Sequence, residues 1–261
     1  MATISSNKID QRFDRLRHAG RKALVCYLTA GHPDYPRSLD LMKGLEDAGA
    51  DVIEVGVPFS DPIADGPIIQ QSSQEALAAG MTLDRTLEMV SAARLEIPVV
   101  LFSYLNPLLA AGDDVLARSR VAGIDGILVT DLPVGADEER ERWLGSSELS
   151  YIRLVAPTTP LERMREIARN GSGFVYLISR LGVTGAQNTL ASDLPETAAR
   201  LRSATDLPVC VGFGVSNAAQ ARAAAEMADG VVVGSAIVRA ASHHLESAFT
   251  LTRSLRDALD S

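Results

Sequence analysis

The sequence predicts an α/β protein built as a single (β/α)8 TIM barrel, and three observations support this. Short β-branched or apolar runs recur eight times along the 261 residues, each followed by a turn and a longer helical stretch. Continuous apolar runs that alternate with helices are typical of parallel strands covered on both faces. Eight units of roughly 30 residues fit one closed barrel better than two domains of about 130 residues. We therefore expect residues 1–261 to form one domain.

The predicted strands follow one another at similar intervals and are separated by segments with helical spacing. In chain order they are Ala23–Thr29, Asp51–Gly56, Ile97–Ser103, Asp125–Thr130, Ser150–Ala156, Gly173–Ser179, Leu207–Gly212 and Asp229–Ser235. Between them, apolar residues recur at spacings of three and four, as helices require. Before the first strand, Ile9, Phe13 and Leu16 share one helical face. This spacing predicts an extra N-terminal helix that closes the lower end of the barrel.

The charge balance excludes several classes of protein. The 25 basic and 33 acidic side chains give a net charge of −8. Without a run of Lys or Arg, a nucleic-acid partner is not expected. No uncharged run reaches the roughly 18 to 20 apolar residues of a membrane span. The first residues show no signal-peptide pattern, and the two cysteines, Cys26 and Cys210, are too few for a disulfide framework. The sequence thus favours a cytoplasmic protein that acts on a small molecule.

An internal repeat places one carboxylate at an unusual position. The repeated segments are 48–56, 122–130 and 226–234, each with an aspartate just before its predicted strand. When these aspartates are aligned, Glu54 takes the position of Leu128 and Val232. Both faces of a barrel strand are covered, so Glu54 is expected to be buried, and burial raises the pKa of a carboxyl group. Glu54 is therefore a candidate acid–base group, the alternative being a structural glutamate paired with an arginine or a hydroxyl.

The segment after the second strand holds a second candidate carboxylate. Asp65 lies eleven residues beyond Glu54, in a loop stiffened by three prolines. Catalytic groups of barrel enzymes lie in such loops at the carboxyl ends of the strands. Asp65 before Gly66, and Asp61 before Pro62, also have a simpler interpretation as turn formers.

Glycine-bearing segments after the sixth, seventh and eighth strands predict a phosphate site. They are 182–185, 212–216 and 234–235. In barrels, a phosphate commonly binds the loops after strands seven and eight through backbone N–H groups at a helix N-terminus. Such a site needs no lysine, so an acidic protein can form it, although glycine at a strand end is also ordinary turn chemistry.

The scarcity of lysine and histidine limits the possible chemistry. None of the three lysines lies at the upper end of a predicted strand, so a Schiff-base mechanism is not expected. A metal site is not expected either: of the four histidines only His32 lies near a strand end, and we interpret it as a loop residue. Carbon–carbon bond chemistry would therefore have to use carboxylates.

The same residues resemble a known family. The run from 53 to 70 reads IEVGVPFSDPIADGPIIQ and resembles the signature of the tryptophan synthase α-chain. The segments YLISRLGVTG at 176–185, VGFG at 211–214 and VGS at 233–235 are similar to that family's sixth strand with its mobile loop and to its phosphate loops. The resemblance runs from about Tyr27 to about Val238. It departs at Tyr27, where the family more often has Phe, and in the wording FSYLN after the third strand.

The resemblance implies a retro-aldol cleavage of indole-3-glycerol phosphate to indole and glyceraldehyde 3-phosphate in tryptophan biosynthesis. By position, Glu54 and Asp65 match the catalytic carboxylates. The implied substrate-orienting and indole-pocket residues are Tyr27, Phe102, Tyr104, Tyr176 and also Phe213. The implied phosphate-binding residues are Gly185, Phe213, Gly214, Gly234 and Ser235. The resemblance also implies an α2β2 complex with a pyridoxal-phosphate-containing β-chain, with partner coupling through Asp61, Asp131 and Thr184, and no cofactor in this chain.

Two other functions remain open on the sequence alone. One is a different phosphate-sugar barrel enzyme, such as an isomerase with Cys26 at the end of the first strand and an acidic partner. The other is a phosphate-binding barrel without catalysis that only activates a partner.

Overall fold

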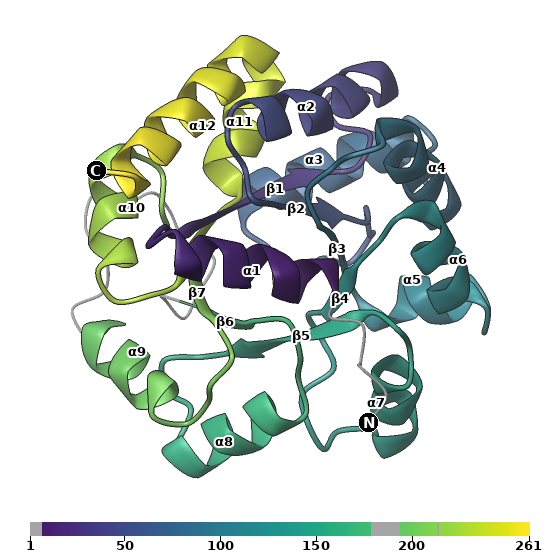
Figure 1. The fold of residues 1–261 in the computed structure, drawn as a ribbon. Coiled ribbons are helices and arrows are strands. Elements are labelled where there is room, and N and C mark those ends of the chain that lie inside the picture. The colour runs from purple at the N-terminus through teal and green to yellow at the C-terminus, as the bar shows by residue number, and fades with distance from the viewer. Residues whose placement is uncertain (1–6, 179–193, 213) are drawn as a thin grey trace.

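The strands of the computed structural model, which describes residues 7–178, 194–212 and 214–261, form a closed parallel barrel (Figure 1). Each strand pairs with the next in the chain, and β8 returns to pair with β1. The strands are β1 Ala23–Thr29, β2 Val52–Gly56, β3 Val99–Ser103, β4 Gly126–Val129, β5 Ser150–Val155, β6 Val175–Ile178, β7 Val209–Gly212 and β8 Gly230–Val233. The predicted barrel is confirmed, and the strand ends differ from the prediction by at most two residues.

The helices cover the outside of this barrel. Within the described residues they are α1 Lys8–His18, α2 Tyr35–Asp47, α3 Pro67–Ala78, α4 Leu83–Ala93, α5 Leu105–Ala110, α6 Val115–Ala122, α7 Glu138–Gly145, α8 Leu161–Arg169, α9 Leu194–Arg202, α10 Ala218–Ala225, α11 Ser235–His243 and α12 Leu245–Leu259. Two helices, not one, follow each of β2, β3 and β8. None of the helices in the described ranges is both long and apolar enough to cross a membrane.

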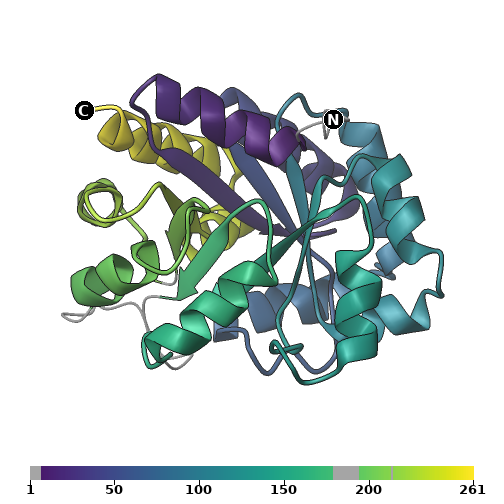
Figure 2. The same cartoon turned by 60° about the horizontal axis from the view of Figure 1, so that its bottom comes forward.

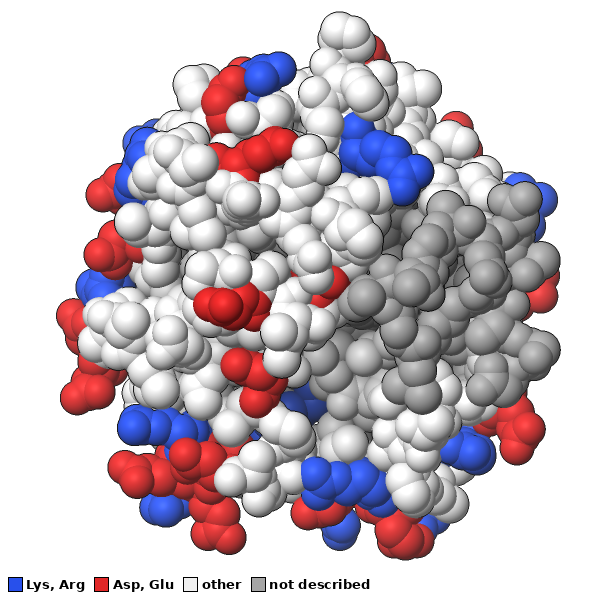
Figure 3. All heavy atoms as spheres, turned by 180° about the vertical axis from the view of Figure 1, so that it is seen from behind, with Lys and Arg blue, Asp and Glu red and all other residues white. Residues whose placement is uncertain are grey.

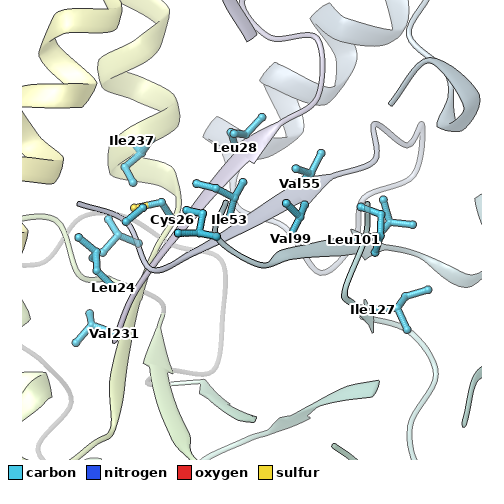
Figure 4. Packing of buried hydrophobic residues seen from close by; sticks show 14 of the residues in the cluster. Leu24, Cys26, Leu28, Ile53, Val55, Val99, Leu101, Ile127, Val231 and Ile237 are labelled. Atoms are coloured by element: carbon cyan, nitrogen blue, oxygen red, sulfur yellow. The ribbon is translucent and has the colours of Figure 1, made fainter. Parts of the chain in front are cut away.

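Side chains alternate along each strand between two apolar layers, as the pleat requires. On β1, Leu24, Cys26 and Leu28 point outward to the helices (Figure 4), whereas Val25 and Tyr27 point into the barrel interior. The strand register aligns Tyr27 with Glu54, and Val25 with Val232. Leu128 and Val232, the residues that align with Glu54 in the repeat, both belong to the interior layer. The same alternation therefore directs Glu54 into the barrel.

The extra N-terminal helix closes one end of the barrel, as the sequence predicts. Helix α1 lies across that end (Figures 1 and 2). Its buried face consists of Ile9, Phe13 and Leu16, which join the interior layer. The rings of Phe13 and Phe174 are 5.5 Å apart. Asn7 caps the helix by accepting a hydrogen bond from the Ile9 N–H. With this end sealed, the opposite end of the barrel is the one available to a ligand.

The repeated aspartates, which we call the strand-start aspartates, have a common structural role. Each lies in the turn before an even-numbered strand and accepts a hydrogen bond from a backbone N–H of the strand before it. The pairs are Asp51 with Leu24 (2.8 Å), Asp125 with Val99 (3.0 Å) and Asp229 with Val209 (2.9 Å). Ser172 takes this role before β6, where its hydroxyl accepts from the Tyr151 N–H at 2.8 Å. The repeat therefore reflects a strand-pairing device used before every even-numbered strand.

Candidate active site

Glu54 is a buried carboxyl group in the middle of β2. Its side chain is on the interior face of the barrel and the residue is only 1% exposed. Its Oε1 has no hydrogen-bond partner among the described residues. A purely structural glutamate would be paired with an arginine or a hydroxyl group. No such group among the described residues forms a hydrogen bond with this oxygen. Burial raises the pKa of Glu54 to about 8.

Asp65 is a second buried carboxyl group, in the turn between β2 and α3. Its backbone N–H donates to the carbonyl of Pro62 at 3.0 Å, so the residue does form a turn. Its side chain is nevertheless buried, and its Oδ2 accepts a hydrogen bond from the Tyr104 hydroxyl at 2.9 Å. Burial raises the pKa of Asp65 to about 6, and the hydrogen bond from Tyr104 opposes this rise. Both interpretations of Asp65 therefore hold: its backbone forms a turn, and its side chain is a buried candidate for catalysis.

Aromatic residues line the interior beside these carboxyl groups. Tyr27 and Phe102 pack edge to face, with ring centroids 5.3 Å apart. Tyr104 packs against Phe59 at 5.0 Å and fixes the Asp65 loop, because its hydroxyl also accepts from the Ala64 N–H at 2.9 Å. Flat, apolar side chains can bind a planar aromatic ligand, and the two neighbouring carboxyl groups can bind a polar group on that ligand.

Two tyrosines occupy space that glycines leave open. A methyl group at Gly56 would lie 2.1 Å from the Tyr27 hydroxyl, and one at Gly212 would lie 2.3 Å from the Tyr176 hydroxyl. Both distances are too short for real contacts, so each glycine makes room for a tyrosine of the preceding strand. Gly212, which the sequence places in a glycine-bearing phosphate segment, therefore has a packing role. Both tyrosines are buried, at 4% and 5% exposure.

Two of the predicted phosphate-binding residues lie at the start of α11. Gly234 follows β8 as the N-cap residue, and Ser235 begins the helix. No side chain of the described residues caps this helix, so its first N–H groups can bind an anion. Gly214 has a φ of +100°, a conformation that glycine readily adopts, and a side chain here would meet open space. Gly185 and Phe213 lie outside the described residues.

Two of the predicted partner-coupling residues, Asp61 and Asp131, lie at the surface. Asp61 is exposed and accepts a hydrogen bond from Ser60 at 2.6 Å. Asp131 is also exposed, and its Oδ1 accepts from the Leu105 N–H at the start of α5 at 2.8 Å. Thr184 lies outside the described residues. Asp61 and Asp131 thus differ from the two candidate catalytic carboxyl groups, which are buried.

A groove borders the loop that carries Asp61. Its volume is about 640 Å³, and Ile63 beside it is 81% exposed. The groove is lined by Phe59, Ser60, Asp61, Pro62, Ile63, Pro67, Gln70, Gln71, Gln74 and Leu77. Figure 3 shows the face opposite α1, where separate acidic side chains lie among uncharged atoms near the centre and charged side chains crowd the lower rim. An exposed large apolar residue beside a groove is typical of an interaction surface.

Cys26 does not occupy a catalytic position. Its side chain is fully buried in the outer layer, between β1 and the helices (Figure 4). Burial raises the pKa of the thiol, so it stays protonated. This position contradicts the alternative of an isomerase that uses Cys26 at the barrel mouth.

His32 is in a polar cluster with Ser242 and Glu75. Its Nε2 lies 2.8 Å from the Ser242 Oγ, and its Nδ1 lies 3.1 Å from a Glu75 carboxylate oxygen. In the part of the chain that the structure describes, no three His, Cys, Asp or Glu side chains are grouped to hold a metal ion.

Comparison with known proteins identifies the family. A family model described as tryptophan synthase alpha chain matches residues 13–258. The chain belongs to the tryptophan synthase alpha chain family. The tryptophan synthase alpha chain of Laribacter hongkongensis is 46% identical over 97% of this chain and 99% of that protein. That of Desulfatibacillum aliphaticivorans is also 46% identical, over 92% and 91%.

Solved structures of the tryptophan synthase alpha chain family share the fold. The structure of tryptophan synthase subunit alpha from Legionella pneumophila superposes with a TM-score of 0.89 at 34% identity, over 98% of this chain and 99% of that one. A tryptophan synthase structure from M. tuberculosis gives 0.88 at 35% identity, over 97% and 100%. The family cleaves indole-3-glycerol phosphate in tryptophan biosynthesis, so this chain is a lyase. The family carries no cofactor of its own.

Two buried hydroxyl-bearing residues beside this site, Thr29 and Ser72, were not predicted from the sequence. The Thr29 hydroxyl lies 2.7 Å from that of Ser72, and both side chains are buried. The alternation along β1 could have indicated Thr29, because it is two residues after Tyr27 and therefore on the same face. No sequence pattern indicated Ser72, which reaches this position only through the path of the Asp65 loop.

Proposed function

We propose that Glu54 and Asp65 catalyse the retro-aldol cleavage of indole-3-glycerol phosphate by carboxylate chemistry alone. The observation that carries this proposal is the pair of buried carboxyl groups with separated pKa values, about 8 for Glu54 and about 6 for Asp65. Near neutral pH the first group is mostly protonated and the second mostly ionised. Two carboxyl groups with pKa values pushed apart by their surroundings are suited to act as acid and as charge stabiliser.

The proposed steps conserve atoms and charge. Protonated Glu54 delivers its proton to indole C3, which leaves a positive charge on the ring nitrogen. Ionised Asp65 accepts a hydrogen bond from the indole N–H and stabilises that charge. The Glu54 carboxylate then removes the proton of the hydroxyl on the carbon attached to C3. That carbon becomes the aldehyde of glyceraldehyde 3-phosphate, the carbon–carbon bond breaks, and its electrons restore neutral indole.

We assign the remaining predicted residues to substrate binding. Tyr27, Phe102 and Tyr104 would hold the indole ring, and Tyr176 would orient Glu54. Tyr27, Phe102 and Tyr176 belong to the interior layer of the barrel, and Tyr104 donates a hydrogen bond to Asp65. Gly214, Gly234 and Ser235, with Gly185 and Phe213, would bind the phosphate through backbone N–H groups and a hydroxyl. We also propose that residues 1–261 form one domain and act in the cytoplasm.

Indole release from indole-3-glycerol phosphate tests the catalytic assignment. The wild-type chain should form indole and Glu54→Gln should not, while both retain the same circular dichroism spectrum. Glu88→Gln, a surface change on α4, is the control and should remain active. An active Glu54→Gln variant would overturn the assignment.

We further propose that the chain forms an α2β2 complex with a β-chain that carries pyridoxal phosphate, to which it passes indole. The groove beside Asp61 and the exposed Ile63 support a docking surface there. Asp61, Asp131 and Thr184 would couple the two sites. The test is the mass of the mixed chains in solution. Ile63→Ser should weaken the complex, and Val121→Ser should not, because Val121 is similarly exposed, at 88%, but lies on α6. Failure of the wild-type mixture to associate would overturn this part.

A further inference from the structure

His32 is a buried polar residue that the proposed catalytic steps do not use. It lies in the loop after β1, is 5% exposed, and donates its backbone N–H to the Thr29 carbonyl at 3.1 Å. Its ring lies between two helices. Nε2 is 2.8 Å from the Ser242 Oγ on α11, and Nδ1 is 3.1 Å from a Glu75 carboxylate oxygen on α3. The Ser242 contact is a hydrogen bond, whereas the Glu75 contact is close but not aligned as one. We call His32, Glu75 and Ser242 the histidine bridge.

Both partners of His32 are held by their own helices. The other carboxylate oxygen of Glu75 accepts a hydrogen bond from the Gln71 amide at 2.9 Å, one turn earlier on α3. The Ser242 hydroxyl bonds to the Val238 carbonyl at 2.9 Å, one turn earlier on α11. A side chain held in this way follows the position of its helix. The histidine bridge therefore connects the two helices, and not only three side chains.

The two bridged helices carry opposite ends of the proposed substrate site. Helix α3 begins at Pro67, two residues after Asp65, and its Gln70 amide donates to the Asp65 carbonyl at 2.9 Å. Helix α11 begins at Ser235, the end that we propose binds phosphate. The histidine bridge lies about two turns along each helix from these ends. A change in the spacing of the two helices would therefore change the distance between Asp65 and the phosphate site.

The His32 loop is packed more closely on the α3 side than on the α11 side. Helices α3 and α11 lie side by side, and both pack against β1 (Figure 1). A methyl group on Gly31 would lie only 2.1 Å from the Met81 Cγ, and the Met81 N–H donates to the Ala76 carbonyl of α3 at 3.0 Å. The loop is thus held against α3 even without Glu75. The hydrogen bond from His32 to Ser242 is the polar link to α11 that remains.

We propose that His32 is a positioning residue that sets the distance between Asp65 and the phosphate-binding end of α11. The inference rests on the proposed function, in which one substrate contacts Asp65 through its indole N–H and α11 through its phosphate. A ligand that reaches both ends requires the correct distance, whereas a ligand that fills one end does not. A misplacement of about 1 Å in such a site can cost about 10²-fold in rate.

The test compares a ligand that spans the site with ligands that fill one end. Indole release gives kcat/KM for indole-3-glycerol phosphate, and NMR titrations give the Kd values of glycerol 3-phosphate and of indole. His32→Leu, which keeps much of the bulk of the ring without its polar atoms, should lower kcat/KM about tenfold. Both Kd values should stay within about twofold of the wild type, because each of these ligands needs only one end.

Matched variants identify the contact that matters. Ser242→Ala should lower kcat/KM more than Glu75→Gln does, because the loop is already packed against α3 through Met81. Ser254→Ala, which changes another exposed serine but on α12, is the control and should have no effect. His32→Gln, whose amide nitrogen can take the place of Nε2, should restore much of the activity lost in His32→Leu. In a His32→Leu background, Ser242→Ala should have no further effect.

Spin labels on the two helices measure their spacing without the reaction. Gln74→Cys on α3 and Arg239→Cys on α11 provide exposed labelling positions, while both native cysteines are fully buried. The distance distribution from pulsed electron paramagnetic resonance should shift or broaden with His32→Leu and with Ser242→Ala. It should not change with Ser254→Ala.

The outcomes distinguish this inference from the proposed function. If His32→Leu leaves either kcat/KM or the distance distribution unchanged, the histidine bridge is only a packing feature and the inference is wrong. It is also wrong if the Kd of either single-end ligand rises as much as kcat/KM falls, since the variant then damages that end and not the spacing. If the wild-type chain releases no indole, the proposed function is wrong, while the spin-label distances still decide whether His32 fixes the two helices.

Discussion

Asp51, just before β2, and Glu54, in the middle of β2, are acidic residues of equal burial with opposite surroundings. Asp51 precedes the strand at the closed end of the barrel, and Glu54 lies three residues further on, toward the open end. Both are 1% exposed. Asp51 accepts from the Leu24 N–H and from Arg12 and Arg256, each at 2.8 Å. Glu54 has no comparable partners in the described residues, and its Oε1 is unsatisfied there.

This contrast shows that pairing, and not burial, separates a structural carboxylate from a reactive one. An ionised carboxylate in the interior is costly unless opposite charge and hydrogen bonds compensate it. Asp51 has both, and through Arg12 and Arg256 it joins α1 and α12 to the strands. Glu54 lacks such compensation and holds its proton instead, as the rise of its pKa to about 8 indicates.

Glu54→Gln should produce the largest effect, which is on activity. The substitution keeps the size of the side chain and removes the proton donor and base. General acid–base groups contribute about 10² to 10⁴ in rate, and Glu54 is proposed for two proton transfers, so the loss should lie at the upper end. Single-turnover indole formation measures it. A residual rate above one hundredth of the wild-type rate would show that another group shares the proton transfers.

Asp51→Ala should produce the largest effect on stability. It leaves two arginines without their buried partner and removes a strand-pairing hydrogen bond. Loss of one partner of a buried ion pair costs about 3–5 kcal/mol in unfolding free energy. Asp14→Ala, which breaks an exposed contact with Arg17 at 3.8 Å, is the control and should cost less than about 1 kcal/mol. Equal losses in urea unfolding would contradict a stabilising role for the buried pairing of Asp51 with the two arginines.

The pH dependence of folding stability should also reveal the raised pKa of Glu54. Its pKa is raised from 4.5 to about 8, so the folded chain binds this proton more tightly than the unfolded chain does. Folding stability from this group is therefore full below about pH 4.5 and is lost as the pH rises toward about 8, by at most about 1.4 kcal/mol per pH unit. Asp65 acts in the same direction between 3.8 and about 6.

Urea unfolding of the wild type and of Glu54→Gln between pH 5 and pH 8 measures this contribution. The variant lacks the titrating group, so its stability should fall less over this range, and its advantage over the wild type should be greatest at pH 8. Parallel curves for the two proteins would mean that Glu54 titrates alike in the folded and unfolded chains.

The sequence predicted the barrel and the buried position of Glu54 because both follow from short-range patterns. Apolar runs mark the strands, and the repeat fixes which residues share a face, so aligning Glu54 with Leu128 and Val232 was enough to place it inside. Contacts between distant segments could not be predicted in this way. The pairing of Asp51 with Arg256 joins residues 205 positions apart, and the Thr29–Ser72 bond depends on how the Asp65 loop folds back.

The smallest predicted effect concerns the strand-pairing position where the repeat changes. Ser172 replaces an aspartate before β6 and accepts from the Tyr151 N–H at 2.8 Å. The sequence repeat does not reveal this position, because the three repeated segments share an aspartate and this turn has a serine instead. Ser172→Ala should cost about 1 kcal/mol in unfolding free energy, as expected for one neutral hydrogen bond, and should leave indole release unchanged. Ser203→Ala, which removes a hydroxyl that donates to the Arg200 carbonyl from the turn just after α9, should cost less. Equal costs for both would show that the hydroxyl before β6 does not stabilise strand pairing as the strand-start aspartates do.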